Sequence, residues 1–138
     1  MHKAKACVLI CMDFRFQKQI QKWLEKSGYL GVCDEIIVAG ASRDLVKPIE
    51  TFHKDALLRQ IELSVKLHDP DEILIIDHQD CGGYAQDKTI PSGLSEEKDR
   101  REHIKFAIQA KNLLSSKFPE KIIKNYYAKL DGSIEKLV

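Results

Sequence analysis

The chain has 138 residues, of which 43% are hydrophobic and 31% charged, and its formal net charge is +1. A chain of this length can bury a hydrophobic core without disulfides, and the composition is ordinary for a globular protein. The near-zero charge argues against a nucleic-acid-binding protein, and no apolar run approaches the ~18 residues that a membrane helix needs. We therefore expect one domain over residues 1–138, with neither nucleic acid nor membrane as partner.

The few residues before Val8 leave no room for a signal peptide, so we expect a cytoplasmic protein. In a reducing compartment, cysteines are more often metal ligands or core residues than disulfide partners. This chain has four of them: Cys7, Cys11, Cys33 and Cys81.

The first half of the chain alternates between short apolar runs and amphipathic segments. Apolar side chains spaced three or four residues apart predict two helices, with stripes of Phe16, Ile20, Trp23 and Leu24 in one and Ile49, Phe52, Ala56 and Leu57 in the other. We expect, in order, a strand over 5–10, a helix over 16–27, a strand over 35–38, a loop over 39–44 and a helix over 48–67.

The second half continues this alternation. It predicts a strand over 72–76, a loop over 78–93, a helix from about residue 95, a strand over 122–130, a tight turn at Asp131-Gly132 and a strand over 134–138. Strands that alternate with helices indicate a parallel sheet. The expected fold is therefore a single α/β domain with a central, mostly parallel sheet, about four parallel strands plus a C-terminal antiparallel strand, and helices on both faces.

Side chains capable of metal binding follow two of the predicted strands. Cys11 comes directly after Val8-Leu9-Ile10, and His78 and Cys81 follow the run Ile73-Leu74-Ile75-Ile76. If the second and third strands flank the first, the tip of the first strand is a topological switch point, where such sheets bind their ligands. In that arrangement the tips of the first and third strands are neighbours, and Cys11 lies close to His78 and Cys81.

Two thiolates and one imidazole are a ligand set suited to zinc. Taken singly, Cys11 is better explained as a core thiol at a strand end, and Cys81 as a small buried residue in a turn. Taken together with His78 they favour a Zn²⁺ site, and three protein ligands leave one position open, as in catalytic zinc sites. Cys7 should not reach the site, because four residues of strand span about 13 Å, and Cys33 belongs at the opposite edge of the sheet.

Asp13 and Arg15 follow Cys11 closely enough to take part. The Asp13 carboxylate can accept a hydrogen bond from a metal-bound water or ligate the metal itself. Arg15 has the spacing to form a bidentate pair that keeps this carboxylate ionised and aimed. Without a metal, the same two residues would read as a surface ion pair at a helix start.

The motifs Cys11-x-Asp13-x-Arg15, Ala39-Gly40 and His78-x-x-Cys81-Gly82-Gly83 resemble those of the β-class carbonic anhydrases. The resemblance implies a zinc lyase that hydrates CO2 to bicarbonate and a proton by a zinc-bound hydroxide. It implies Cys11, His78 and Cys81 as zinc ligands, a catalytic Asp13–Arg15 dyad, and Asp13 as a fourth ligand in a closed state. It also implies a homodimer or higher homo-oligomer.

The sequence departs from this family pattern at several positions. No helical arm is expected before the first strand, and Phe14, Val38 and Asp77 stand where the family usually has a small residue, an asparagine and a glycine. By strand alternation, Asp77 should face away from the metal. Two alternatives to CO2 hydration stay open: hydrolysis of a related small molecule such as COS or CS2 at the same site, and a catalytically weak zinc-binding regulatory protein.

Overall fold

The computed structural model, which describes residues 2–138, contains a five-stranded sheet in the order β2-β1-β3-β4-β5. Neighbouring strands among the first four pair in parallel, and β5 pairs antiparallel with β4. The strands are β1 (Ala6–Cys11), β2 (Cys33–Val38), β3 (Glu72–His78), β4 (Ile122–Ala128) and β5 (Ile134–Lys136). The predicted α/β class and mostly parallel sheet are confirmed.

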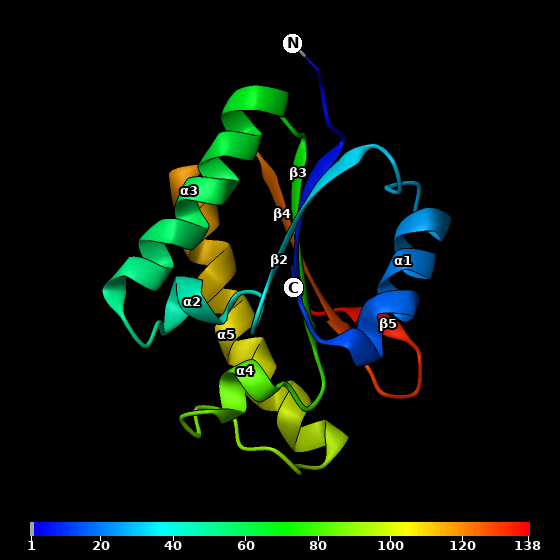
Figure 1. The fold of residues 1–138 in the computed structure, drawn as a ribbon, viewed down its shortest axis with the longest axis vertical. Coiled ribbons are helices and arrows are strands. Elements are labelled where there is room, and N and C mark those ends of the chain that lie inside the picture. Colours follow the sequence, from blue (N-terminus) through cyan, green and yellow to red (C-terminus); the bar gives the residue numbers. More distant parts are fainter. Residues whose placement is uncertain (1) are drawn as a thin grey trace.

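Helices cover both faces of the sheet, as expected (Figure 1). The helix α1 lies on one face, and the other helices lie on the opposite face. The helical elements are the 3-10 turn η1 (Phe14–Phe16) and the helices α1 (Gln17–Lys26), α2 (Arg43–Val46), α3 (Thr51–His68), α4 (Gly82–Ala85) and α5 (Glu96–Lys117).

The two central strands explain why the sheet needs cover on both sides. All of β1 is buried, and so is β3 apart from Glu72. Parallel strands read as continuous apolar runs because both their faces are packed. The strand β2 lies at an edge, and its residues are half-buried or exposed throughout. The apolar runs of β1 and β3 therefore fix the middle of the sheet.

Two separate hydrophobic cores result, one on each face. The core on the α1 face joins Phe16, Ile20 and Leu24 to the even-numbered side chains of β1. The core on the other face joins the odd-numbered side chains of β1 to α2, α3, α4 and α5. This odd-even division follows from the alternation of side chains along a strand. Cys11 belongs to the second core.

The strands β2 and β3 flank β1 on opposite sides. The tip of β1 is therefore the switch point that the sequence suggested, and ligands of such sheets bind at this position. Cys11 ends β1 and His78 ends β3. No helix within residues 2–138 is long and apolar enough to span a membrane.

Three local expectations were wrong. The one-turn helix α2 begins within the loop expected over 39–44 and extends beyond it, and the one-turn helix α4 lies inside the loop expected over 78–93. The connection between β4 and β5 is a five-residue loop over 129–133 rather than a two-residue turn at Asp131-Gly132. At the start of α3, Phe52 and Ile49 are exposed, because the helix begins at Thr51 and turns Leu57 and Ile61 towards the core instead.

One buried side chain in α5 predicts how stability depends on pH. His103 has no solvent exposure, and neither ring nitrogen has a hydrogen-bond partner. Burial lowers the pKa of this imidazole to about 3, although the Asp99 carboxylate lies 3.5 Å from its Nε2. The folded chain therefore keeps His103 neutral, whereas the unfolded chain binds a proton near pH 6.5.

Because only the unfolded state takes up that proton, stability falls as the pH drops below 6.5. When the pH falls from 7 to 5, the burial of neutral His103 is expected to lower the free energy of unfolding by about 2 kcal/mol. His103→Leu, which keeps a similar volume, should lose this part of the pH dependence. Urea unfolding of both proteins at both pH values measures the difference. An identical pH dependence in the two proteins would contradict a neutral buried imidazole.

Candidate metal centre

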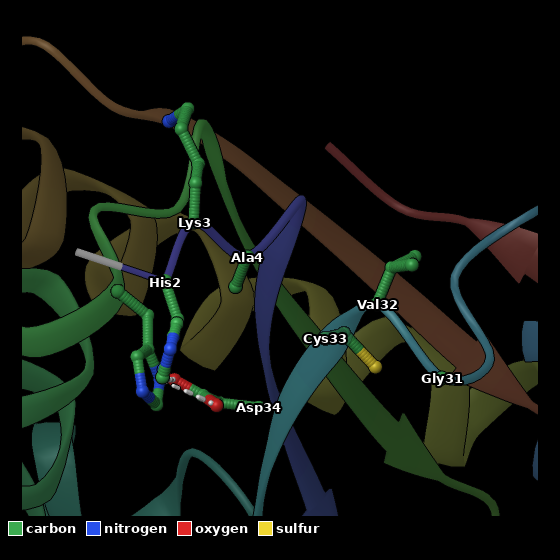
Figure 2. A pocket seen from close by; sticks show the side chains of 8 residues that line it. His2, Lys3, Ala4, Gly31, Val32, Cys33 and Asp34 are labelled. Atoms are coloured by element: carbon green, nitrogen blue, oxygen red, sulfur yellow. Dashed lines mark hydrogen bonds and ion pairs between the residues drawn. The ribbon is translucent and has the colours of Figure 1, made fainter.

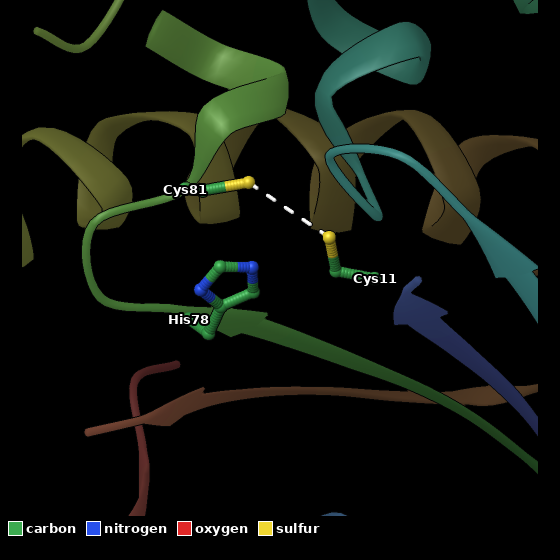
Figure 3. A group of neighbouring side chains, drawn as sticks. All are labelled: Cys11, His78 and Cys81. Carbon is green, nitrogen blue, oxygen red and sulfur yellow. Dashed lines mark hydrogen bonds between the residues drawn. The ribbon is translucent and has the colours of Figure 1, made fainter. Parts of the chain in front are cut away.

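The structure brings Cys11, His78 and Cys81 together at the C-terminal tips of β1 and β3 (Figure 3). One ligand atom from each residue lies within 4.8 Å of the others, and all three residues are buried. Within residues 2–138 this is the one group of three or more potential metal-ligating side chains that meets this spacing. The two sulfur atoms are 3.9 Å apart.

The orientation of His78 suits a metal ligand. Its Nδ1 lies 2.8 Å from the carbonyl oxygen of Gln79, which makes Nδ1 the protonated nitrogen. Its Nε2 is buried without any hydrogen-bond partner. Phe16 stacks on the ring with centroids 4.2 Å apart and fixes its plane. A buried nitrogen lone pair without a donor, held in one orientation, fits a metal ion as its partner.

The Cys11 and Cys81 thiols share one proton across their 3.9 Å contact. The hydrogen bond from the Cys81 thiol lowers the pKa of Cys11, and the backbone N–H of Gly40, 3.4 Å from Cys11 Sγ, adds to that effect. The same shared proton raises the pKa of Cys81. Burial lowers the pKa of His78, but the Cys11 thiolate, the carbonyl oxygen of Gln79 and the Asp13 carboxylate together outweigh burial and raise it. A divalent cation would replace the protons that hold these groups together.

Asp13 and Arg15 form the bidentate pair that the sequence predicted. Arg15 donates through Nη2 to Asp13 Oδ2 at 2.8 Å and through Nε to Oδ1 at 3.2 Å. The backbone N–H of Arg15 donates to Oδ1 as well, at 3.0 Å. These bonds, the arginine side chain foremost, lower the pKa of Asp13. The carboxylate lies beside the metal-binding group, with Oδ2 3.7 Å from His78 Nε2.

Asp80 holds the other side of the Arg15 guanidinium and is a residue that sequence reasoning missed. Its carbonyl oxygen accepts from Arg15 Nη2 at 2.9 Å, and its carboxylate lies 3.4 Å from Nη1. Asp80 adopts a left-handed backbone with φ of 56°. Its place between His78 and Cys81 was the available signal, because that short span must turn back towards β1.

A cavity of about 510 Å³ opens onto the site and is lined mainly by apolar surface. Its walls include Met12, Phe14, Ala39 and Gly83, together with Cys11 and the Asp13–Arg15 pair. Met12 and Phe14 line it and are 66% and 83% exposed. Phe14 therefore lines the approach to the site, and its ring does not fill it.

Asp77 and Val38, the two other departures from the family pattern, lie beside the site. Val38 is half-buried and pairs in register with Cys11. The Asp77 carboxylate is buried and bonded to Ser42 and Tyr84, and it is not one of the clustered ligand atoms. Burial raises its pKa to about 6. Its hydroxyl partners were not foreseen from the sequence.

The remaining two cysteines lie outside the ligand group. Cys7 is buried in β1, and Cys33 begins β2. A second pocket at that opposite end of the sheet is lined by Cys33, Asp34 and His68 (Figure 2). The His68 Nδ1 contacts the Asp34 carboxylate at 2.8 Å. This pocket offers no three-ligand cluster among the described residues.

A family model described as "Putative carbonic anhydrase" matches residues 1–138. Two curated relatives, both named as uncharacterized proteins, come from Rickettsia bellii and Rickettsia conorii. They are 26% and 25% identical over 137 residues, which is 99% of this chain and 84% and 74% of theirs.

Solved structures share the fold. A tetrameric beta-carbonic anhydrase from Sordaria macrospora superposes with a TM-score of 0.66 at 12% identity, over 99% of this chain and 82% of that one. A beta-carbonic anhydrase from Trichomonas vaginalis gives 0.64 at 16% identity, over 99% and 84%. At such low identity these likenesses show the fold.

Proposed function

Because the chain belongs to the family described as "Putative carbonic anhydrase", we propose that it is a zinc-dependent lyase that reversibly hydrates CO2 to bicarbonate and a proton. One observation carries the proposal: the buried ligand atoms of Cys11, His78 and Cys81 lie within 4.8 Å of one another, beside the ionised carboxylate of Asp13. A structural zinc site has no use for such a carboxylate at an open cavity.

In this proposal, Cys11, His78 and Cys81 hold one Zn²⁺, which when bound acidifies water and so supplies a nucleophile near neutral pH. The unpartnered Nε2 of His78 and the shared proton of the two thiols support this ligand set. Two thiolates neutralise the charge of the cation. We therefore expect a less acidic water than three imidazoles would produce, and activity that increases with pH.

Asp13 acts in this proposal as the hydrogen-bond acceptor that orients the attacking water. Arg15 holds both carboxylate oxygens, so Asp13 stays ionised and keeps one orientation while this pair is intact. The distance of 3.7 Å from His78 Nε2 also supports a second role for Asp13, as a fourth ligand that closes the site. Arg15 itself offers a positive charge near the position of the bicarbonate product.

The cavity supports a small apolar substrate. Met12, Phe14 and Ala39 present carbon atoms to anything that approaches Cys11, and CO2 has no net charge and no hydrogen to donate. The same apolar lining favours COS or CS2 as a second candidate substrate, since both are linear and uncharged like CO2 and their sulfur atoms are more polarisable than oxygen. Turnover of either compound above that of CO2 would make it the better assignment.

We further propose that the protein works in the cytoplasm as a homodimer or higher homo-oligomer. The beta-carbonic anhydrase from Sordaria macrospora that shares this fold is described as tetrameric. The exposed side chains of Met12, Phe14 and Ile37 lie on or next to the edge strand β2 and support a subunit contact there.

Stopped-flow CO2 hydration, on protein whose zinc content is assayed in the same sample, tests the proposed activity. We expect kcat/KM to rise from pH 6 to pH 9 as the attacking water loses its proton. Asp13 remains ionised throughout this range, because Arg15 holds its pKa below the ordinary value. Asp13→Ala should lower kcat/KM by about 100-fold, the lower end of what a positioned acid–base group contributes, because Asp13 orients the water without taking its proton.

Asp55→Ala, at an exposed aspartate of α3, serves as the matched control and should keep wild-type rates. A flat pH profile, or full activity in Asp13→Ala, would contradict the proposed roles. One zinc per chain without turnover of CO2, COS or CS2 would favour a non-catalytic zinc-binding protein instead.

A further inference from the structure

A closed polar network lies directly behind the metal centre. Ser42 Oγ donates to Asp77 Oδ2 at 2.8 Å, and Tyr84 Oη donates to Asp77 Oδ1 at 3.3 Å. The two hydroxyl oxygens are 3.1 Å apart, and the backbone N–H of Ser42 reaches Asp77 Oδ1 at 3.4 Å. None of these residues is more than 1% exposed. Water therefore cannot replace a lost partner.

Two members of the network lie close in the chain to a candidate metal ligand, and the third lies close to a residue that bonds to one. Asp77 precedes His78 in β3, and Tyr84 lies in α4, three residues after Cys81. Ser42 follows Gly40, whose backbone N–H donates to Cys11 Sγ. The network thus joins β3, which carries His78, and the segment after Cys81 to the loop whose Gly40 contacts Cys11.

Arg43 makes a second connection between the segment around Ser42 and the turn that contains Gly83. Its guanidinium is buried and donates through Nη1 to the carbonyl oxygen of Gly83 at 2.6 Å. It also pairs with Asp87 and so anchors the chain beyond α4. The segment 40–43 supplies no candidate metal ligand itself. Its buried polar bonds point instead to a role in holding the turn around Cys81 against the tip of β1.

We propose that Ser42, Asp77 and Tyr84 are positioning residues that hold Cys11, His78 and Cys81 at metal-binding spacing and thereby determine the affinity for zinc. This inference rests on the proposed zinc binding. Removal of either hydroxyl leaves a buried carboxylate oxygen short of a donor, which is costly in a low-dielectric interior. The chain segments around Ser42, Asp77 and Tyr84 then shift so that the Asp77 oxygen finds another donor. This shift changes the spacing of the three ligands in the metal-free protein.

The test measures the zinc dissociation constant by competition with a chelator in wild type, Ser42→Ala and Tyr84→Phe. Both substitutions remove one hydroxyl, and Tyr84→Phe keeps the ring that packs against His103 and Phe106. We expect zinc affinity to fall by about tenfold or more in each variant, the size of effect seen when residues that support ligands are changed. The absorption bands of the cobalt-loaded proteins should shift as well.

Matched controls exist at the opposite end of the sheet. Ser64 Oγ donates to Asp34 at 2.6 Å, and Tyr29 Oη donates to Glu72 at 2.7 Å, and both residues are buried. Ser64→Ala and Tyr29→Phe therefore remove the same groups from carboxylate partners far from the metal centre. They should leave zinc affinity and the cobalt spectrum unchanged, and their melting temperatures report the cost of losing such a bond where the carboxylate partner is partly exposed.

Zinc affinity within twofold of wild type in both Ser42→Ala and Tyr84→Phe, or a loss no greater than in the controls, would overturn the inference. Wild-type protein that binds zinc without hydrating CO2 would refute the proposed activity alone, since the affinities still test the network. Wild-type protein that binds no zinc would refute both.

Discussion

Substitution of Cys81 by alanine is expected to remove tight zinc binding and nearly all CO2 hydration. Cys81 supplies one of three candidate ligands and also the thiol whose hydrogen bond stabilises the Cys11 thiolate. With one thiolate gone, two ligands on separate strand tips remain. A catalytic metal contributes several kcal/mol of transition-state stabilisation, so the rate should fall by about a thousandfold.

Elemental analysis and stopped-flow hydration on the same preparation measure both effects. Cys33→Ala is the matched control, because Cys33 is a half-buried cysteine at the opposite end of the sheet and outside the ligand group. It should retain zinc and activity. A Cys81→Ala protein that keeps one zinc per chain and a rate within tenfold of wild type would refute the assignment of Cys81 as a ligand.

Among substitutions that add a single methyl group near the site, Gly83→Ala is expected to destabilise the protein most. A Cβ on Gly83 would lie 2.6 Å from the backbone nitrogen of Gly40 and 2.7 Å from its Cα. Both are backbone atoms, so no side chain can rotate away. The loop that donates to Cys11 would have to move from the turn that carries Cys81. We expect a loss of about 3 kcal/mol in unfolding free energy, at the upper end for overpacking, and weaker zinc binding.

The neighbouring residue provides the control. A Cβ on Gly82 would meet no atom within 4 Å, and this glycine has an ordinary helical backbone in α4. Gly82→Ala should therefore be neutral, or slightly stabilising because alanine favours a helix. Urea unfolding and zinc titration of both variants make the comparison. Equal stabilities would show that the contact between Gly83 and Gly40 is looser than described.

The strands that position the site were predictable because their signal is local. The apolar runs before Cys11 and His78 identify β1 and β3, and the alternation of elements makes the sheet parallel. From these two facts, and from an arrangement in which the second and third strands flank the first, the two cysteines and the histidine were predicted to meet at the switch point. The structure has them there.

The details around the site were not predictable, because they depend on contacts between distant segments. The helices α2 and α4 have four residues each, too few for a helical period to appear in the sequence. The partners of Asp77 come from Ser42, 35 residues earlier, and from Tyr84. Phe52 and Leu57 both belong to the apolar stripe that the sequence predicts for α3, but tertiary packing buries only Leu57.

The candidate ligands also belong to different sides of the molecule. His78 stacks on Phe16, which is part of the core beneath α1. Cys11 and Cys81 belong to the core beneath α3 and α5. A cation held by all three would be released if either core opened. The free energy needed to open either core would therefore increase by the binding free energy of the cation. In the zinc-loaded protein the two cores would therefore resist local unfolding jointly, and their amide protons would exchange as one cooperative unit.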